Sequence, residues 1–419
     1  MVESGKLVGT QTVDRTDVAP ELADGWAALL RHERIPFVSY PYEWTFGMLR
    51  DAALLQLELL LSALDEDLTL KDATPYNVQW RGTEPVFIDV GSFERLRPGE
   101  AWAGYRQFCM LFLYPLLVRA LRGVPFQPWL RGSIDGITPE ECRRLLAGRD
   151  LRRRGVFAHV YLHAKLERRY GDRRRDLKRE LRSAGFSKEL IRVNVRKLER
   201  LVRSLEPRHE ESAWTTYGAV NTYSEADAEG KAAFVQAAAE ATRPRLVWDI
   251  GCNDGRYSRV AAGASEYVLA IDADERVVDR LYRALRAEGI RNILPLVVDV
   301  ADPSPALGWR NRERRTLSER GRPDLTLCLA LVHHLAITRN VPIRELLDWL
   351  RSLGTALVIE FATPEDAMVE RLLAAKPEGL HSDYAREPFE RALGSAFAVE
   401  RSEELSSGTR VLYFARPRP

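Results

Sequence analysis

The stretch Leu246-Val-Trp-Asp-Ile-Gly-Cys-Asn-Asp-Gly-Arg-Tyr257 decides the fold of the second half of the chain. Apolar residues lead directly into an acidic turn that contains two glycines. Gly251 and Gly255 have no Cβ, so the backbone can bend tightly there and approach a ligand closely. A helix that begins after such a turn offers free N–H groups. The pattern predicts a strand, a nucleotide-binding turn and a helix.

Asp249 indicates which ligand suits this turn. A turn that binds pyrophosphate begins with glycine and avoids additional negative charge. An acidic residue at its start suits a ligand that carries an amino group and a sulfonium, because opposite charges attract. S-adenosylmethionine is such a ligand, so we expect it to bind here.

Two further acidic residues follow apolar segments. Residues Tyr267–Asp272 end in a carboxylate roughly twenty residues after the glycines, a spacing that places Asp272 at ribose hydroxyls. The segment Ile293–Val300 is expected to end, as a strand, around Asp299, where a carboxylate can accept a hydrogen bond from the adenine amino group. Three strands would then present three carboxylates to one ligand.

Residues from about 214 to the end resemble a class I S-adenosylmethionine-dependent methyltransferase. The resemblance implies an α/β fold with a Rossmann-like, seven-stranded sheet. The residues that match the family's cofactor motifs are Asp249, Gly251, Gly255, Asp272 and Asp299. Asn253 stands where the family usually has a middle glycine, and asparagine tolerates positive φ better than most residues.

An aromatic segment, residues 214–223, precedes the first expected helix of this half. In related enzymes this region folds over the cofactor. The resemblance implies that Trp214, Tyr217 and Tyr223 form a lid that excludes water. The alternative interpretation is that these side chains bury the junction between two domains.

Candidate catalytic residues follow the next two expected strands, residues 324–331 and 356–360. Functional residues of open α/β sheets lie outside the carboxyl ends of the strands. His333 or His334 is therefore a candidate to accept or position the acceptor's proton, since imidazole titrates near neutrality. The alternative for the histidines is helix capping or core hydrogen bonding. Glu360 is a further candidate, and its alternative is a salt-bridged acid.

The acceptor chemistry is constrained only indirectly. A sulfonium methyl group is already activated, so alignment of nucleophile, methyl and sulfur supplies most of the rate. The histidines and acids lack a metal-ligand spacing, so we predict no metal site. An Asn-Pro-Pro-Tyr motif, typical of amine methylation, is absent after the fourth strand. This favours an oxygen or carbon acceptor.

The N-terminal half contains a second pattern. Leu70–Val78 holds an acid and an asparagine in the arrangement D-x-x-x-x-N, and Val86–Gly91 follows after a hairpin-like gap. The arrangement resembles the catalytic and metal-binding loops of protein and aminoglycoside kinases. The resemblance implies that Asp72 would orient an acceptor hydroxyl and that Asn77 and Asp89 would hold magnesium.

The residues before this pattern show no Gly-rich phosphate loop and no Val-Ala-Ile-Lys-like strand. Without them a nucleoside triphosphate would lose most of its electrostatic cradle. We therefore expect a degenerate module, mainly helical and similar to a kinase C-terminal lobe. Two alternatives stay open: an active phosphotransferase, and an unrelated helical domain in which Asp72 and Asn77 are turn and capping residues.

Length and composition indicate a soluble protein of more than one domain. The chain has 419 residues, of which 45% are hydrophobic and 29% charged. We predict a kinase-like module at 1–150, a basic helical linker at 151–210 and a methyltransferase domain at 211–419. There is no apolar stretch of about twenty residues and no apolar leader at Met1, so we expect a cytoplasmic protein without a membrane partner. The four cysteines, expected to be reduced and structural, are Cys109, Cys142, Cys252 and Cys328.

The net charge of +2 conceals an uneven distribution. Between Asp150 and Glu206 there are about ten more basic than acidic residues, including Arg173–Arg175. Residues 190–202 have apolar positions at helical spacing, which predicts an amphipathic helix with a basic outer face. That face is either simply solvated or a patch for an anionic partner such as nucleic acid.

The combination of the two halves resembles nodulation-type methyltransferases of bacteria and their relatives in biosynthetic clusters. It implies methyl transfer to a small-molecule or glycan-like metabolite, with the kinase-like module shaping the acceptor site. The alternatives are a nucleic-acid methyltransferase that uses the basic helices and a bifunctional kinase and methyltransferase. The acceptor and the oligomeric state stay open at this point.

Overall fold

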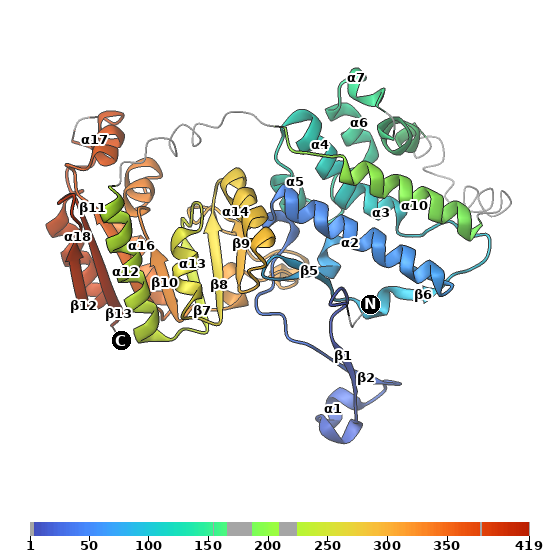
Figure 1. Ribbon diagram of the computed structural model, residues 1–419, viewed down its shortest axis with the longest axis horizontal. Helices are drawn as coiled ribbons and strands as arrows, with labels where there is room; N and C mark the ends of the chain where they lie inside the picture. The colour runs from blue at the N-terminus through green and yellow to red at the C-terminus, as the bar shows by residue number, and fades with distance from the viewer. Residues whose placement is uncertain (1–3, 154, 166–186, 209–223, 378, 419) are drawn as a thin grey trace. The chain divides into compact units, whose positions relative to one another are not determined.

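The computed structural model describes residues 4–153, 155–165, 187–208, 224–377 and 379–418 (Figure 1). The chain divides into two compact units, Met1–Glu210 and Glu211–Pro419. The residues described between 151 and 208 belong to the first unit.

The C-terminal unit contains a seven-stranded sheet with the order β12-β13-β11-β10-β7-β8-β9. The five strands from β11 to β9 are parallel, and β13 runs antiparallel to both β11 and β12. The strands are β7 (Leu246–Ile250), β8 (Tyr267–Asp272), β9 (Ile293–Val297), β10 (Leu325–Cys328), β11 (Ala356–Ala362), β12 (Phe397–Glu404) and β13 (Arg410–Pro417). This order confirms the predicted Rossmann-like, seven-stranded sheet.

Helices alternate with these strands along the chain. They are α12 (Glu225–Thr242), α13 (Arg256–Ala262), α14 (Glu275–Glu288), the 3-10 helix η7 (Trp309–Asn311), α15 (Leu317–Arg320), the π-helix η8 (His334–Thr338), α16 (Ile343–Ser352), α17 (Ala367–Ala374) and α18 (Arg386–Ala396). Apolar side chains of α12, α13 and α14 form one core with strand residues such as Val247 and Val358. Alternate strand residues, such as Trp248 and Leu269, are buried as well. The central strands are therefore covered on both faces, which explains their continuous apolar sequences.

The order of the strands reverses beside β7, which pairs with β8 on one side and with β10 on the other. Ligands of open α/β sheets bind outside the carboxyl ends of the strands at such a switch point. The turn after β7, the end of β8 and the segment after β10 therefore meet at one edge of the sheet.

The N-terminal unit is mainly helical. Its helices are α1 (Pro20–Ala23), α2 (Phe46–Asp65), α3 (Tyr105–Phe108), the π-helix η5 (Cys109–Leu113), α4 (Tyr114–Arg122), α5 (Gln127–Gly132), α6 (Pro139–Leu145), α7 (Gly148–Leu151), the π-helix η6 (Phe157–Leu162) and α10 (Lys188–Arg203). Four 3-10 turns are η1 (Arg15–Asp17), η2 (Pro41–Glu43), η3 (Pro75–Asn77) and η4 (Val90–Ser92). Short antiparallel pairs join β1 (Thr10–Val13) to β2 (Leu29–His32), β3 (Leu68–Leu70) to β6 (Phe93–Arg95), and β4 (Val78–Arg81) to β5 (Glu84–Phe87).

The amphipathic helix predicted at residues 190–202 is confirmed as α10. The segment 108–118 is helical and entirely buried. Helix α10 packs against α2 through Ile191, Val195, Leu198 and Val202, which recur at helical spacing. All four cysteines are free and buried, as predicted. Among the helices that the structure describes, none is long and apolar enough to cross a bilayer.

Candidate cofactor and active site

The turn after β7 has the backbone that its sequence predicts. Gly251, Asn253 and Gly255 have φ values of 78°, 48° and 77°. Asn253 thus adopts the positive φ expected where a glycine is replaced. A Cβ on Gly255 would lie 2.5 Å from Leu281 Cδ1 of α14, so any other residue there would force that side chain to move. The N–H groups of Gly251 and Cys252 both donate to the Ile271 carbonyl of β8, at 2.8 and 3.0 Å.

Asp272, the last residue of β8, fixes this turn from the neighbouring strand. Its Oδ2 accepts from the Asn253 N–H at 3.0 Å, and its Oδ1 accepts from the Asp274 N–H at 2.9 Å. Burial raises the pKa of Asp272, while these backbone hydrogen bonds lower it. Asp274 caps helix α14, and its Oδ2 is buried without a hydrogen-bond partner in the described chain. An unpaired acceptor of this kind is suited to a donor on a ligand.

Asp249 lies within β7 and is almost fully buried. Its Oδ2 accepts a hydrogen bond from the Ser258 hydroxyl of α13 at 2.5 Å. Burial, together with the neighbouring acids Asp272 and Asp254, raises the pKa of Asp249 to about 7, against the opposing effect of the Ser258 hydrogen bond. The cofactor-free protein therefore disfavours the charged form of this carboxylate, because its environment compensates the negative charge poorly.

Four acids thus surround the turn: Asp249, Asp254, Asp272 and Asp274. None of them forms an ion pair with a lysine or arginine of the described residues. Arg256, which begins α13, pairs instead with Glu225 at 3.3 Å. Carboxylates that lie this close repel one another unless a cation lies between them. This edge of the sheet is therefore a candidate site for a positively charged ligand.

Asp299 differs from the other predicted cofactor residues. Strand β9 ends at Val297, two residues before the expected end around Asp299. Asp299 lies in the following turn, where its Oδ1 accepts from the Ala301 N–H at 2.9 Å and its Oδ2 pairs with Arg339. One of its carboxylate oxygens is thus already neutralised, and its adenine contact stays a prediction.

The two candidate histidines follow β10. Ala330 has a φ of 49°, a strained value for alanine, and the chain then enters η8. His333 is 1% exposed, and its ring lies 4.3 Å from that of His334, which is half-buried. Burial lowers the pKa of both imidazoles, and Arg410 lowers them further. Both rings are therefore neutral at neutral pH.

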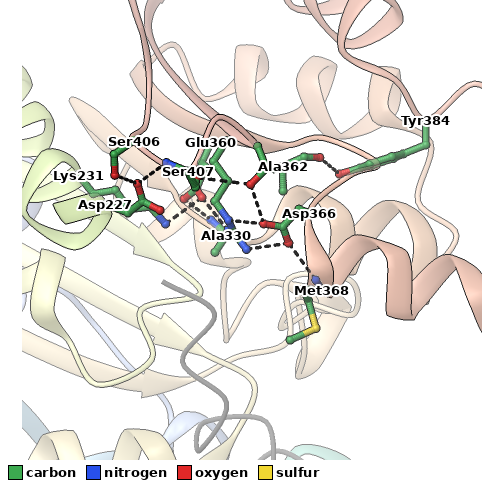
Figure 2. A network of polar contacts seen from close by, with 12 residues as sticks. Asp227, Lys231, Ala330, Glu360, Ala362, Asp366, Met368, Tyr384, Ser406 and Ser407 are labelled. Atoms are coloured by element: carbon green, nitrogen blue, oxygen red, sulfur yellow. Dashed lines mark hydrogen bonds and ion pairs between the residues drawn. The ribbon is translucent and has the colours of Figure 1, made fainter. Parts of the chain in front are cut away.

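Glu360 of β11 belongs to a buried ion network (Figure 2). Its Oε1 lies 2.8 Å from Lys231 Nζ of α12 and 2.8 Å from the Arg410 guanidinium of β13. Arg410 also forms a bidentate pair with Asp366, at 2.7 and 3.0 Å. The structure thus shows the salt-bridged acid that was the alternative interpretation of Glu360, because two buried cations flank it. It offers no support for Glu360 as a catalytic residue.

The same network reaches the histidine segment. Glu360 Oε2 accepts from the Ala330 N–H at 3.0 Å and so holds the strained turn that precedes His333. At the other end, Asp227 accepts from the Ser406 hydroxyl at 2.7 Å and from the Ser407 N–H at 3.1 Å (Figure 2). The network ties α12, β11, β13 and the start of α17 together beneath the candidate active site.

In the N-terminal unit the structure brings two of the three kinase-like residues together. Asn77 Nδ2 donates to Asp89 Oδ2 at 3.0 Å. The backbone of Asp72 is fixed by Ser92, whose hydroxyl accepts from the Asp72 N–H at 3.2 Å, and by Gln56. Thr74, rather than Asp72 or Asn77, caps the 3-10 turn η3. Among the described residues, no three His, Cys, Asp or Glu side chains form a metal-binding group.

Three predicted lid residues, Trp214, Tyr217 and Tyr223, lie outside the described residues, as does the basic segment Arg173–Arg175. The sequence interpretation missed Asp254 and Asp274, although both stand within two residues of a predicted site residue. The sequence feature that could have identified them is the high density of acidic residues around two expected strand ends. A hollow of about 620 Å³ near Arg243 and Glu266 lies at the amino ends of β7 and β8 and is not part of this site.

Comparisons with known proteins identify a relative over almost the whole chain. The sequence is 35% identical over 421 residues to the nodulation protein NoeA of Rhizobium meliloti (strain 1021), covering 99% of this chain and 87% of NoeA. No family model matches the chain. The N-methyltransferase NodS of Bradyrhizobium japonicum WM9 is 16% identical with a TM-score of 0.35, covering 46% of this chain and 98% of NodS.

A second solved structure, magnesium protoporphyrin IX methyltransferase (ChlM) of Synechocystis PCC 6803 with bound S-adenosylmethionine, is 18% identical with a TM-score of 0.32. It covers 50% of this chain and 86% of ChlM. These two similarities concern about half of the chain and assign no residue a role.

The sheet order, the glycine turn and the uncompensated acids define the class of the C-terminal unit, which is that of the S-adenosylmethionine-dependent methyltransferases. The full-length similarity defines the family: the chain belongs to the family of the nodulation protein NoeA.

Proposed function

We propose that the protein transfers the methyl group of S-adenosylmethionine to an oxygen or carbon atom of a small-molecule or glycan-like metabolite. The observation that carries this proposal is the set of four acids at the switch point of the sheet, which no described cation neutralises. The amino group and sulfonium of the cofactor supply the missing positive charge. Asp272 would hold the ribose hydroxyls, while Gly251, Asn253 and Gly255 shape the turn.

When bound, the cofactor supplies an activated methyl group, so the protein has mainly to align the acceptor. Of the two histidines, we assign the acceptor contact to His334, because it is half-buried whereas His333 is fully covered. A neutral imidazole can accept a hydrogen bond or a proton from an acceptor hydroxyl. His333 would then support the His334 ring from beneath.

The cofactor assignment is tested by calorimetric titration with S-adenosylhomocysteine. Asp272→Ala removes a carboxylate that can bind two ribose hydroxyls and should cost about 1.5–3 kcal/mol, which is tenfold or more in affinity. Asp348→Ala is the matched control, since Asp348 is an exposed acid of α16. Micromolar binding that Asp272→Ala leaves unchanged would refute the assignment.

For the N-terminal unit, we propose a degenerate kinase-like module that contributes to acceptor recognition and transfers no phosphoryl group. The contact between Asn77 and Asp89 supports the resemblance, and the sequence before α2 still lacks a phosphate loop. Melting temperatures measured with ATP, with and without Mg²⁺, test this proposal. We expect that ATP with Mg²⁺ does not raise the melting temperature in a way that depends on Asp89. A Mg²⁺-dependent shift that Asp89→Asn abolishes would favour the bifunctional alternative instead.

A further inference from the structure

A basic hollow lies in the N-terminal unit, far along the chain from the kinase-like loop. Its volume is about 400 Å³, within the range of small-molecule sites. The lining residues come from the end of α4, from α7 and from the segments that follow α7 and α10. They are Ala120, Leu121, Arg149, Asp150, Arg153 and Arg208. Three arginines and one aspartate thus line the hollow.

The single acid of the hollow is already engaged. Asp150 is buried, its Oδ2 accepts from the Ala147 N–H at 3.1 Å, and it lies 3.6 Å from the Arg122 guanidinium. Arg149 and Arg153 are exposed and form no ion pair with an acid among the residues described. The hollow therefore has an excess of positive charge, which suits an anionic ligand. Guanidinium groups bind phosphate oxygens in bidentate geometry.

An aromatic surface lies one helical turn further along. The Phe157 N–H donates to the Arg153 carbonyl at 3.3 Å, so Phe157 follows Arg153 on the same side of this segment. Phe157 is 47% exposed and stacks on Tyr161, with ring centroids 5.1 Å apart and an interplanar angle of 20°. Both belong to η6, and π-helical turns occur frequently at functional sites. A supported, exposed ring is a platform on which a nucleobase can stack.

We propose that this basic and aromatic surface binds a nucleoside diphosphate. The phosphoryl groups occupy the hollow between Arg149, Arg153 and Arg208, and the base stacks on Phe157. The limited volume of the hollow favours a free nucleotide over a nucleic-acid strand. This inference is independent of the methyl-transfer proposal, because none of its residues belongs to the cofactor site.

The test is calorimetric titration of the full chain with uridine diphosphate, pyrophosphate and uridine, in EDTA and with S-adenosylhomocysteine at saturation. We expect uridine diphosphate to bind more tightly than pyrophosphate, and uridine to bind most weakly. The double variant Arg149→Gln/Arg153→Gln should lower the affinity for uridine diphosphate at least about tenfold. Phe157→Ala should weaken uridine diphosphate but leave pyrophosphate unchanged, since only the nucleotide carries a base.

The matched control is Arg143→Gln/Arg144→Gln on α6, which removes the same charge where both arginines pair with Glu140. It should leave the affinity unchanged. Parallel titrations use Mg²⁺ in place of EDTA, and a single-stranded oligonucleotide in place of the nucleotide. Four results would overturn the proposal: no binding of uridine diphosphate, an equal loss in the control variant, binding that appears only with Mg²⁺ and is lost in Asp89→Asn, or binding only of the oligonucleotide. The last result would identify a nucleic-acid surface.

Discussion

Arg410→Met is expected to lower the free energy of unfolding of the C-terminal unit by about 3–5 kcal/mol, because it leaves buried carboxylates without their cation. Glu360 would retain Lys231 as its only described partner cation, and Asp366 would lose both of its guanidinium hydrogen bonds. The methionine side chain occupies much of the space of the arginine side chain. The loss of stability therefore reports the removed charge more than a cavity. Urea unfolding measures this loss of stability. The transition of the C-terminal unit is recognised as the one that S-adenosylhomocysteine shifts.

The control lies on the same strand. Arg416 of β13 pairs with Glu400 at 2.8 Å, but both side chains are about half exposed. Arg416→Met should cost no more than about 1 kcal/mol, as surface ion pairs do. Equal losses in the two variants would show that the network around Glu360 has no special role in stability. The Arg410 variant should also bind S-adenosylhomocysteine once folded, since no cofactor residue is removed.

Asp249→Asn is expected to raise the free energy of unfolding of the cofactor-free protein above that of the wild type. This gain should be larger at pH 8 than at pH 5. Burial raises the pKa of Asp249 to about 7 in the folded state, above the ordinary value of 3.8. The folded state therefore binds this proton more tightly than the unfolded chain does. The stability that it contributes is present at low pH and is lost as the pH rises from about 4 to about 7. The loss approaches about 4 kcal/mol, since each pKa unit corresponds to about 1.4 kcal/mol.

Asparagine has no charge to desolvate and can still accept the Ser258 hydroxyl hydrogen bond. Urea unfolding of both proteins at several pH values measures the effect. The difference in stability, variant minus wild type, should rise between pH 4 and 7 and then become constant. The variant should also bind the cofactor more weakly, because a compensating anion is lost. If the difference in free energy of unfolding between variant and wild type does not change with pH, burial does not raise the pKa of Asp249 and the prediction is wrong.

The cofactor turn was predictable because its information is local. The spacing of Asp249, Gly251 and Gly255 defines a strand and a tight turn, and Asn253 has the positive φ expected of it. The seven-stranded sheet was implied by the resemblance to class I methyltransferases, which those local motifs carry. The expected end of β9 was wrong by two residues, since Val298 is apolar and buried although it lies beyond the paired residues.

The surroundings of Glu360 were not predictable, because its partners are remote in sequence. Arg410 is 50 residues away, and Lys231 lies on a helix before the first strand of the sheet. No local pattern shows that β13 returns beside β11 and places a guanidinium against that carboxylate. The strained Ala330 turn, held by the same carboxylate, is likewise a product of tertiary structure.

The central claim, methyl transfer to a small molecule, is tested most directly with S-adenosylmethionine labelled in its methyl group. The full chain is incubated with a bacterial extract, which is then separated into metabolite, nucleic-acid and protein fractions. We predict label in the metabolite fraction, and none with Asp272→Ala. If the acceptor is a hydroxyl oxygen or a carbon atom, the label should resist mild treatments that cleave methyl esters. Label in the nucleic-acid fraction, or no transfer by a protein that binds the cofactor, would contradict the account.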